Sequence, residues 1–132
     1  KEPFKREELF KKDVSVSWNA DEFNELLIFE PNQGQAKESC LFNLKGSIEI
    51  DSIYNNISIV FAGTNKKGEQ VHYSSFPLRW YFGARNLKFE FKINHPISLV
   101  EDDVHSVKVY LWNPNKRSIH LGESMLKVSR LK

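Results

Sequence analysis

Features that mark several protein classes are scarce in this chain of 132 residues. No stretch approaches the ~20 apolar residues of a membrane-spanning helix, and no signal-peptide core of ~7–15 apolar residues lies near the start. Direct membrane insertion by these residues is therefore not expected. The single cysteine, Cys40, excludes an internal disulfide and leaves the redox compartment open. Because no local cationic cluster would activate it, we expect a small buried side chain rather than a reactive thiol.

The charges show no excess of one sign. Lysine and arginine number 19 against 17 acidic residues, and they are spread along the chain rather than gathered into a basic stripe. Because nucleic-acid binding normally needs such a stripe to neutralise phosphates, a nucleic-acid partner is not expected. With 40% hydrophobic residues, the chain is long enough for one domain with a core and too short for two.

Motifs of catalysis and metal binding are missing as well. The chain has no Gly-x-Ser-x-Gly elbow, no glycine-rich phosphate loop and no His-Glu-x-x-His. The four histidines, His72, His95, His105 and His120, are isolated in sequence, although folding could still bring two of them together. The acids at 101–103 could offer oxygen ligands to calcium, but such turns are more often simply solvated. We predict no catalytic residues, no metal and no cofactor; a small hydrolase with paired carboxylates is the least favoured alternative.

The beginning of the chain differs in composition from the rest. Residues 1–12 include eight charged residues and few large apolar ones. We interpret them as a charged linker, with a short helical turn over 6–11, and we interpret residues 13–132 as a single domain. Because the chain opens with Lys1 rather than methionine, we expect a processed protein or a piece of a longer parent chain.

Alternation of apolar and polar residues dominates the remainder. Residues 87–93 and 106–112 show it most clearly, and a period of two indicates half-buried strands rather than helices. Similar patterns predict strands at 14–18, 23–29, 39–50, 57–62, 70–76, 119–121 and 125–131. We expect a bend at Gly46 and a hairpin at 64–69 in which Gly68 takes a positive φ. The pattern predicts an all-β antiparallel sandwich with about eight to ten strands.

Aromatic residues provide the best indication of a ligand. Val107, Val109 and Leu111 alternate with Tyr110 and Trp112, so if the valines face the core, the two rings face outward. The stretch at 78–85, interpreted as a strand end running into a loop, adds further rings and arginines. Flat rings beside hydrogen-bonding groups suit a sugar-binding surface. The candidate ligand-binding residues are Arg79, Trp80, Tyr81, Arg85, Tyr110 and Trp112. The alternative is that these rings cap the second face of the sheet beneath a loop, because large aromatic side chains are also ordinary packing residues in sandwiches.

The last third of the chain resembles a known family. Residues 107–116, 119–123 and 126–128 look like the closing strands of galactose-binding-like jelly rolls, which often carry Val-x-Val-Tyr-hydrophobic-Trp-Asn before a short final strand. Carbohydrate-binding modules and their non-catalytic relatives in bacterial envelope proteins share these strands. In such domains an aspartate commonly precedes the final strand, whereas residues 121–124 here read Leu-Gly-Glu-Ser. The resemblance therefore implies the jelly-roll fold more than a calcium site or a ligand.

Together these observations predict a non-catalytic accessory domain of a larger, extracytoplasmic envelope-associated bacterial protein. Its partner would be a glycan or another envelope protein. A glycan-binding module would use the aromatic and arginine side chains, whereas a purely structural or protein-contacting domain would use its surface or an edge strand. An exposed aromatic surface would favour the first of these alternatives.

Overall fold

The computed structural model describes residues 6–31, 39–51, 56–81, 87–101 and 103–131, and within them the chain is almost entirely β-structure. The elements are β1 (Arg6–Asp13), β2 (Val16–Asn19), β3 (Phe23–Phe29), β4 (Ser39–Ile50), β5 (Ser58–Thr64), β6 (Gln70–Pro77), the 3₁₀ helix η1 (Leu78–Tyr81), β7 (Lys88–Ser98), β8 (Ser106–Trp112), β9 (Ile119–Leu121) and β10 (Met125–Leu131). The predicted all-β class is confirmed. Among these residues, no helix has the length and apolar character needed to cross a membrane.

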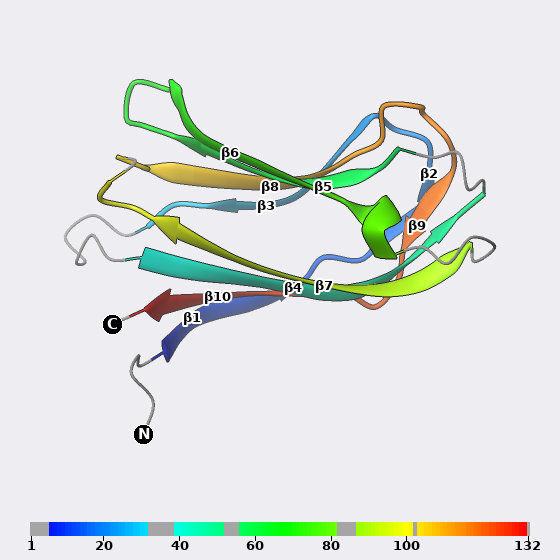
Figure 1. Ribbon diagram of the computed structural model, residues 1–132, viewed down its shortest axis with the longest axis horizontal. Helices are drawn as coiled ribbons and strands as arrows, with labels where there is room; N and C mark the ends of the chain where they lie inside the picture. Colours follow the sequence, from blue (N-terminus) through cyan, green and yellow to red (C-terminus); the bar gives the residue numbers. More distant parts are fainter. Residues whose placement is uncertain (1–5, 32–38, 52–55, 82–86, 102, 132) are drawn as a thin grey trace.

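The strands form two antiparallel sheets that lie one above the other (Figure 1). A four-stranded sheet has the order β3-β8-β5-β6. A six-stranded sheet has the order β1-β10-β4-β9-β2, with β7 paired to the other edge of β4. Two layers of sheet with a core between them make a β-sandwich, as the alternating sequence predicts.

The order of the strands is that of a jelly roll. In the six-stranded sheet β10 and β9 pair with successive stretches of β4, at Cys40–Lys45 and Ile48–Ile50, so they act as two parts of one broken strand. β1 and β2 continue the sheet beyond them in the same way. Each sheet thus places strands from the two ends of the chain beside strands from its middle, which is the crossed connectivity of two Greek keys.

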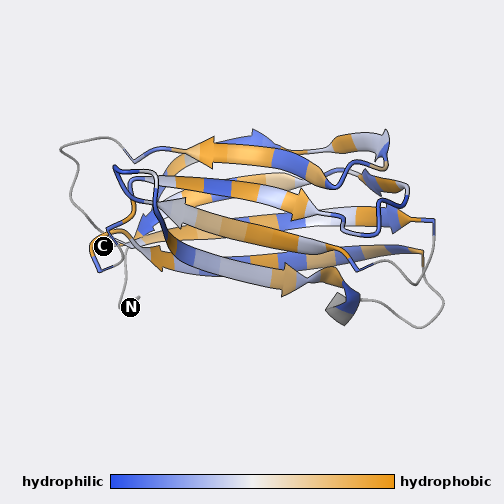
Figure 2. Cartoon of the chain, turned by 90° about the horizontal axis from the view of Figure 1, so that it is seen from above, coloured by the Kyte–Doolittle hydropathy of each residue, from blue (hydrophilic) through white to orange (hydrophobic). Residues whose placement is uncertain are grey.

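The core lies between the sheets and draws on both of them. Phe42 and Leu44 of β4 are fully buried, as are Phe61 of β5 and Leu111 of β8. The ring of Phe42 packs edge-on against that of Phe61, with centroids 5.7 Å apart, so the two sheets meet through aromatic contact. Figure 2 shows hydrophobic and hydrophilic residues alternating along the strands, which is why each sheet has one face for the core and one for solvent.

The helical turn expected over residues 6–11 is wrong. These residues belong to strand β1, which pairs with β10 from Arg6↔Leu131 to Asp13↔Met125. Residues 6–12 are therefore part of the sandwich rather than a linker, whereas residues 1–5 lie outside the described residues. The charged composition suggested a linker, but charged side chains also suit the solvent face of an outer strand. Leu9 packs against the core, and this contact holds the strand in place.

Two other elements differ from their sequence patterns. Residues 78–81 form η1 instead of continuing a strand, and Leu78 at its start is fully buried. Strand β7 runs past Ile93 and through His95 and Pro96 to Ser98. Proline is tolerated there because β7 is an edge strand, where a missing backbone N–H interrupts no second ladder. The positive φ predicted for Gly68 is confirmed at 81°.

Candidate functional site

Strand β8 sets which aromatic side chains face outward. Val107, Val109 and Leu111 are fully buried in the core. Because successive side chains on a strand point to opposite faces, Tyr110 and Trp112 lie on the outer face of the four-stranded sheet, and both are half-buried there. The outward orientation inferred for these two rings is therefore confirmed, whereas a ligand-binding role and the alternative, in which the rings only cap this face of the sheet, both stay predictions.

Other rings join them from neighbouring strands. Phe23 of β3 lies opposite Trp112, and its ring stands edge-on to that of Tyr110 with centroids 5.9 Å apart. Tyr73 of β6 lies near Tyr110 on the other side, close enough to raise the pKa of its hydroxyl. Phe23 is 60% exposed and Tyr73 is 50% exposed. We call Phe23, Tyr73, Tyr110 and Trp112 the aromatic face.

The aromatic face has its own buried floor. Val60 of β5 lies between Tyr110 and Ser75 in register and points away from the core, since Ile59 and Phe61 on either side of it point inward. Val60 nevertheless has no exposed surface. The neighbouring side chains on the outer face therefore cover it, which makes the centre of this face a packed surface rather than a set of loose rings.

Polar groups hold and surround the rings. The indole Nε1 of Trp112 donates a hydrogen bond to Glu22 Oε2 at 3.3 Å. Glu25 and Lys108, neighbours on the same face, form an exposed ion pair with Nζ and Oε1 3.9 Å apart. Burial raises the pKa of the Tyr110 hydroxyl, and the neighbouring Tyr73 hydroxyl raises it further. The phenol thus stays protonated at neutral pH, and its oxygen can accept a hydrogen bond from a ligand hydroxyl.

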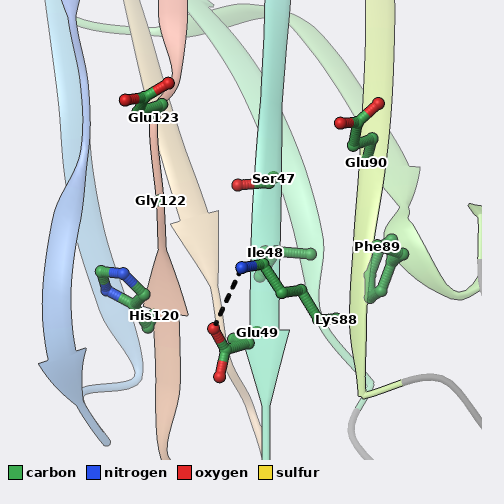
Figure 3. A pocket seen from close by; sticks show the side chains of 9 residues that line it. All are labelled: Ser47, Ile48, Glu49, Lys88, Phe89, Glu90, His120, Gly122 and Glu123. Atoms are coloured by element: carbon green, nitrogen blue, oxygen red, sulfur yellow. Dashed lines mark ion pairs between the residues drawn. The ribbon is translucent and has the colours of Figure 1, made fainter.

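The outer face of the other sheet is charged instead. Figure 3 shows a hollow there, lined among others by Ser47, Glu49, Lys88, Glu90, His120 and Glu123. The carboxylate of Glu49 pairs with Lys88 Nζ at 3.8 Å. The imidazole of His120 lies 2.9 Å from the carbonyl oxygen of Val16 through Nδ1 and stacks on Trp18, which is 50% exposed. These contacts are typical of a solvated polar surface, and none of them is a hydrogen bond between a general base and a nucleophilic side chain.

The remaining predicted site residues are placed differently. Arg79 is exposed on η1, which passes between the two layers at one end of the sandwich (Figure 1). Trp80 and Tyr81 belong to the same helix, but their side chains lie outside what the structure describes, as does Arg85 altogether. A binding role for these four residues stays a prediction.

Sequence reasoning missed Phe23 and Tyr73. Both residues lie in strands that the sequence predicts. The alternation along those strands could therefore have shown that their side chains point outward. What the pattern lacks is strand order: only the pairing of β3 with β8, and of β5 with β6, brings these rings beside Tyr110.

Comparisons with known proteins support the fold and nothing finer. No protein-family model matches the chain, and no curated protein does. Among solved structures, the infectious bursal disease virus VP2 subviral particle matches with a TM-score of 0.66 and 9% identity, over 97% of this chain and 33% of that one. The Gx strain of the same virus matches with a TM-score of 0.61 and 9% identity, over 98% of this chain and 33% of that one. The T13 particle of this virus matches with a TM-score of 0.61 and 11% identity, over 96% of this chain and 30% of that one.

The chain thus spans about a third of the length of these viral chains. At such low identity the likeness concerns the path of the backbone and not the chemistry of a site. No match supports the resemblance to galactose-binding-like or carbohydrate-binding domains beyond a shared all-β sandwich. What the topology and the comparisons establish together is that this chain has a jelly-roll-like β-sandwich fold.

Proposed function

We propose that this chain is a non-catalytic binding domain and that its aromatic face binds carbohydrate. The observation that carries the proposal is the gathering of Phe23, Tyr73, Tyr110 and Trp112 on one outer sheet face, with Phe23 and Tyr73 at least half exposed. Large apolar surface exposed as a patch indicates a contact with something other than water.

The polar groups around the rings favour a sugar as the ligand. A sugar ring presents C–H groups on one side and hydroxyls around its rim. The aromatic rings supply apolar surface for the first, while the Tyr110 hydroxyl and the exposed side chains of Glu25 and Lys108 supply donors and acceptors for the second. A rigid sheet holds these groups in place, which lowers the entropic cost of binding.

We also propose the setting in which the domain works. It would be an accessory domain of a longer, extracytoplasmic protein associated with a bacterial envelope. This part of the proposal is supported by the resemblance of residues 107–116, 119–123 and 126–128 to the closing strands of carbohydrate-binding modules and envelope domains.

A protein-contacting role is the second candidate. Ile28 of β3 lies on the same outer face, opposite Lys108, and is 50% exposed. An aliphatic side chain contributes to protein interfaces through burial, whereas sugar rings stack on flat aromatic groups. A partner protein would therefore depend on Ile28 as well as on the rings.

The test is a glycan-array screen of the purified domain, followed by titration calorimetry with each glycan bound. Phe23→Ala and Tyr73→Ala are the informative variants because both side chains are exposed, so their removal has little effect on folding. We expect each to weaken binding about fivefold or more, since removing an aromatic contact of this kind costs ~1 kcal/mol or more.

Trp18→Ala is the matched control. Trp18 is as exposed as Tyr73 but lies on β2, in the other sheet, and its loss should leave glycan affinity unchanged. Circular dichroism and thermal melting must show that all three variants are folded. If no glycan binds the folded domain, or if Trp18→Ala weakens binding as much as Tyr73→Ala, the carbohydrate proposal is wrong. Dependence of a protein contact on Ile28→Ala would then support the second candidate.

A further inference from the structure

Strand β6 is an edge of the four-stranded sheet, whose order is β3-β8-β5-β6, and among the described residues no strand pairs with its outer side. Its residues Gln70–Pro77 pair with β5 alone. The outer side of an edge strand presents backbone N–H and C=O groups that can pair with another extended chain. An edge of this kind can therefore hold a partner strand.

The ladder between β5 and β6 shows which backbone groups point outward. Leu78 N–H donates to the Ile57 carbonyl at 3.0 Å, so these two residues extend the register of the strands as a hydrogen-bonded pair. Hydrogen-bonded and non-hydrogen-bonded pairs alternate along an antiparallel ladder. The backbone groups of Tyr73 and Ser75 therefore point away from β5, toward the outer side of the edge.

Side chains on the inner face of β6 anchor the strand to the rest of the sandwich. His72 Nε2 lies 2.9 Å from Nε2 of His95 on β7, an edge strand of the other sheet, and 3.3 Å from Ser74 Oγ. The ring of Phe76 stands edge-on to the buried ring of Phe61, with centroids 5.7 Å apart. These contacts hold β6 extended before a partner arrives, which lowers the entropic cost of pairing.

The other edge strands carry features that oppose pairing with a second chain. Strand β1 is mostly charged, and β7 has three charged residues and a proline. Strand β2 has only four residues. Strand β3 is bulged between Glu25 and Leu27, and Lys12 Nζ of β1 donates to the Leu26 carbonyl at 3.2 Å. Charge, proline, short length and bulges all protect a strand edge from intermolecular pairing.

Strand β6 lacks such protection along its middle. Its sequence, Gln-Val-His-Tyr-Ser-Ser-Phe-Pro, contains no lysine, arginine, aspartate or glutamate. Its irregular positions lie at the two ends, with a register shift near the start and Pro77 at the end. An antiparallel copy of this strand would place no like-charged side chains opposite each other, so the edge is compatible with itself.

We propose that β6 pairs with β6 of a second copy of this chain, antiparallel and about a two-fold axis at Ser74. In this register Tyr73 of each copy lies opposite Ser75 of the other, so the outward N–H groups of both residues meet carbonyl oxygens. The two four-stranded sheets become one continuous sheet, and Tyr73 brings the two aromatic faces side by side. Because the contact uses the same edge of both copies, assembly stops at the dimer. The dimer should be weak, since an edge contact buries little surface.

The experiment is sedimentation equilibrium of the whole chain at concentrations up to about 1 mM, with amide hydrogen exchange measured on the same samples. We expect a monomer–dimer equilibrium without larger species. Exchange of the Tyr73 and Ser75 amides should slow as the dimer fraction rises, because only the dimer gives these N–H groups a carbonyl partner. Ser75→Lys places a charge in the contact and its symmetric copy, and should weaken dimerisation at least about tenfold.

Ser17→Lys is the matched control, because it adds the same charge at an exposed position of β2, an edge strand of the other sheet. It should dimerise as the unaltered chain does. Circular dichroism and thermal melting check folding. If Ser75→Lys does not fold, Tyr73→Lys replaces it, at a position that is 50% exposed. A chain that stays monomeric at the highest concentration, species larger than a dimer, or undiminished dimerisation in a folded lysine variant of β6 would overturn the proposal.

Discussion

At position 46, in the middle of β4, only glycine leaves room for the neighbouring backbone. A Cβ placed on Gly46 would lie 2.7 Å from Ser124 Cβ and 3.1 Å from Ser124 Cα. Ser124 is not free to move away, because its Oγ donates to the Gly122 carbonyl at 2.8 Å and its own carbonyl accepts from Val14 N–H at 3.0 Å. Gly46 therefore permits the close passage of the chain between β9 and β10, while β4 continues through it as one strand.

Gly46→Ala should lower the free energy of unfolding by about 1–3 kcal/mol, the usual cost of inserting a methyl group into a packed site. Urea denaturation measures it. Removing the opposing Cβ and Oγ with Ser124→Gly in the same chain should recover part of the loss, and Ser124→Gly alone serves as the reference. Equal stability of Gly46→Ala and the unaltered chain would show that the two strands can separate at little cost.

At the scale of elements, β1 shows how pairing and packing outweigh composition. It pairs with β10 along its length, Leu9 packs against the core, and Lys12 Nζ donates to the Leu26 carbonyl of β3 at 3.2 Å. The last contact connects β1 to the opposite sheet. These interactions give a charged segment a fixed place that its own residues do not specify.

Deletion of residues 1–12 should therefore destabilise the domain. The loss of the β1 ladder and of the Leu9 contact should cost about 2 kcal/mol, which lowers Tm by roughly 5–10 °C for a chain of this size. The deletion also exposes β10 as an edge strand, so we expect increased self-association by light scattering. A chain lacking only residues 1–5 keeps β1 and is the control. An unchanged Tm after the longer deletion would mean that β1 contributes no stability.

At the scale of the whole molecule, the two outer faces differ in character while the core is shared. The four-stranded sheet presents the aromatic face, and the six-stranded sheet presents the charged hollow with its Glu49–Lys88 ion pair. Between them, one continuous cluster of buried residues takes side chains from both sheets. A single cluster predicts that the sheets unfold together rather than one after the other.

Cys40 offers a direct test of this cooperativity. It lies on β4 within the shared cluster and is only 2% exposed, which confirms the buried side chain expected from the sequence. A thiol reagent should react negligibly with the native protein, and its reaction should rise with denaturant along the same curve as tryptophan fluorescence. If Cys40 became labelled at a lower denaturant concentration than that of the fluorescence change, β4 would open before the rest of the domain.

The fold class could be predicted from the sequence alone, because strand alternation is a local property: Val107, Val109 and Leu111 point one way and Tyr110 the other whatever the strand lies beside. The sequence alone did not determine that residues 6–12 form a strand, because what holds β1 is its pairing with β10, more than a hundred residues away in the chain.

The same distinction applies to the candidate sites. The outward direction of Tyr110 and Trp112 could be predicted from alternation, whereas their neighbours Phe23 and Tyr73 follow from the order of strands in the sheet. The meeting of His72 with His95 requires one more step, the packing of one sheet on the other. Local patterns decide which way a side chain points, but contacts between distant segments arise only when hydrophobic burial brings the sheets together, so the neighbours of each side chain follow from the folded structure.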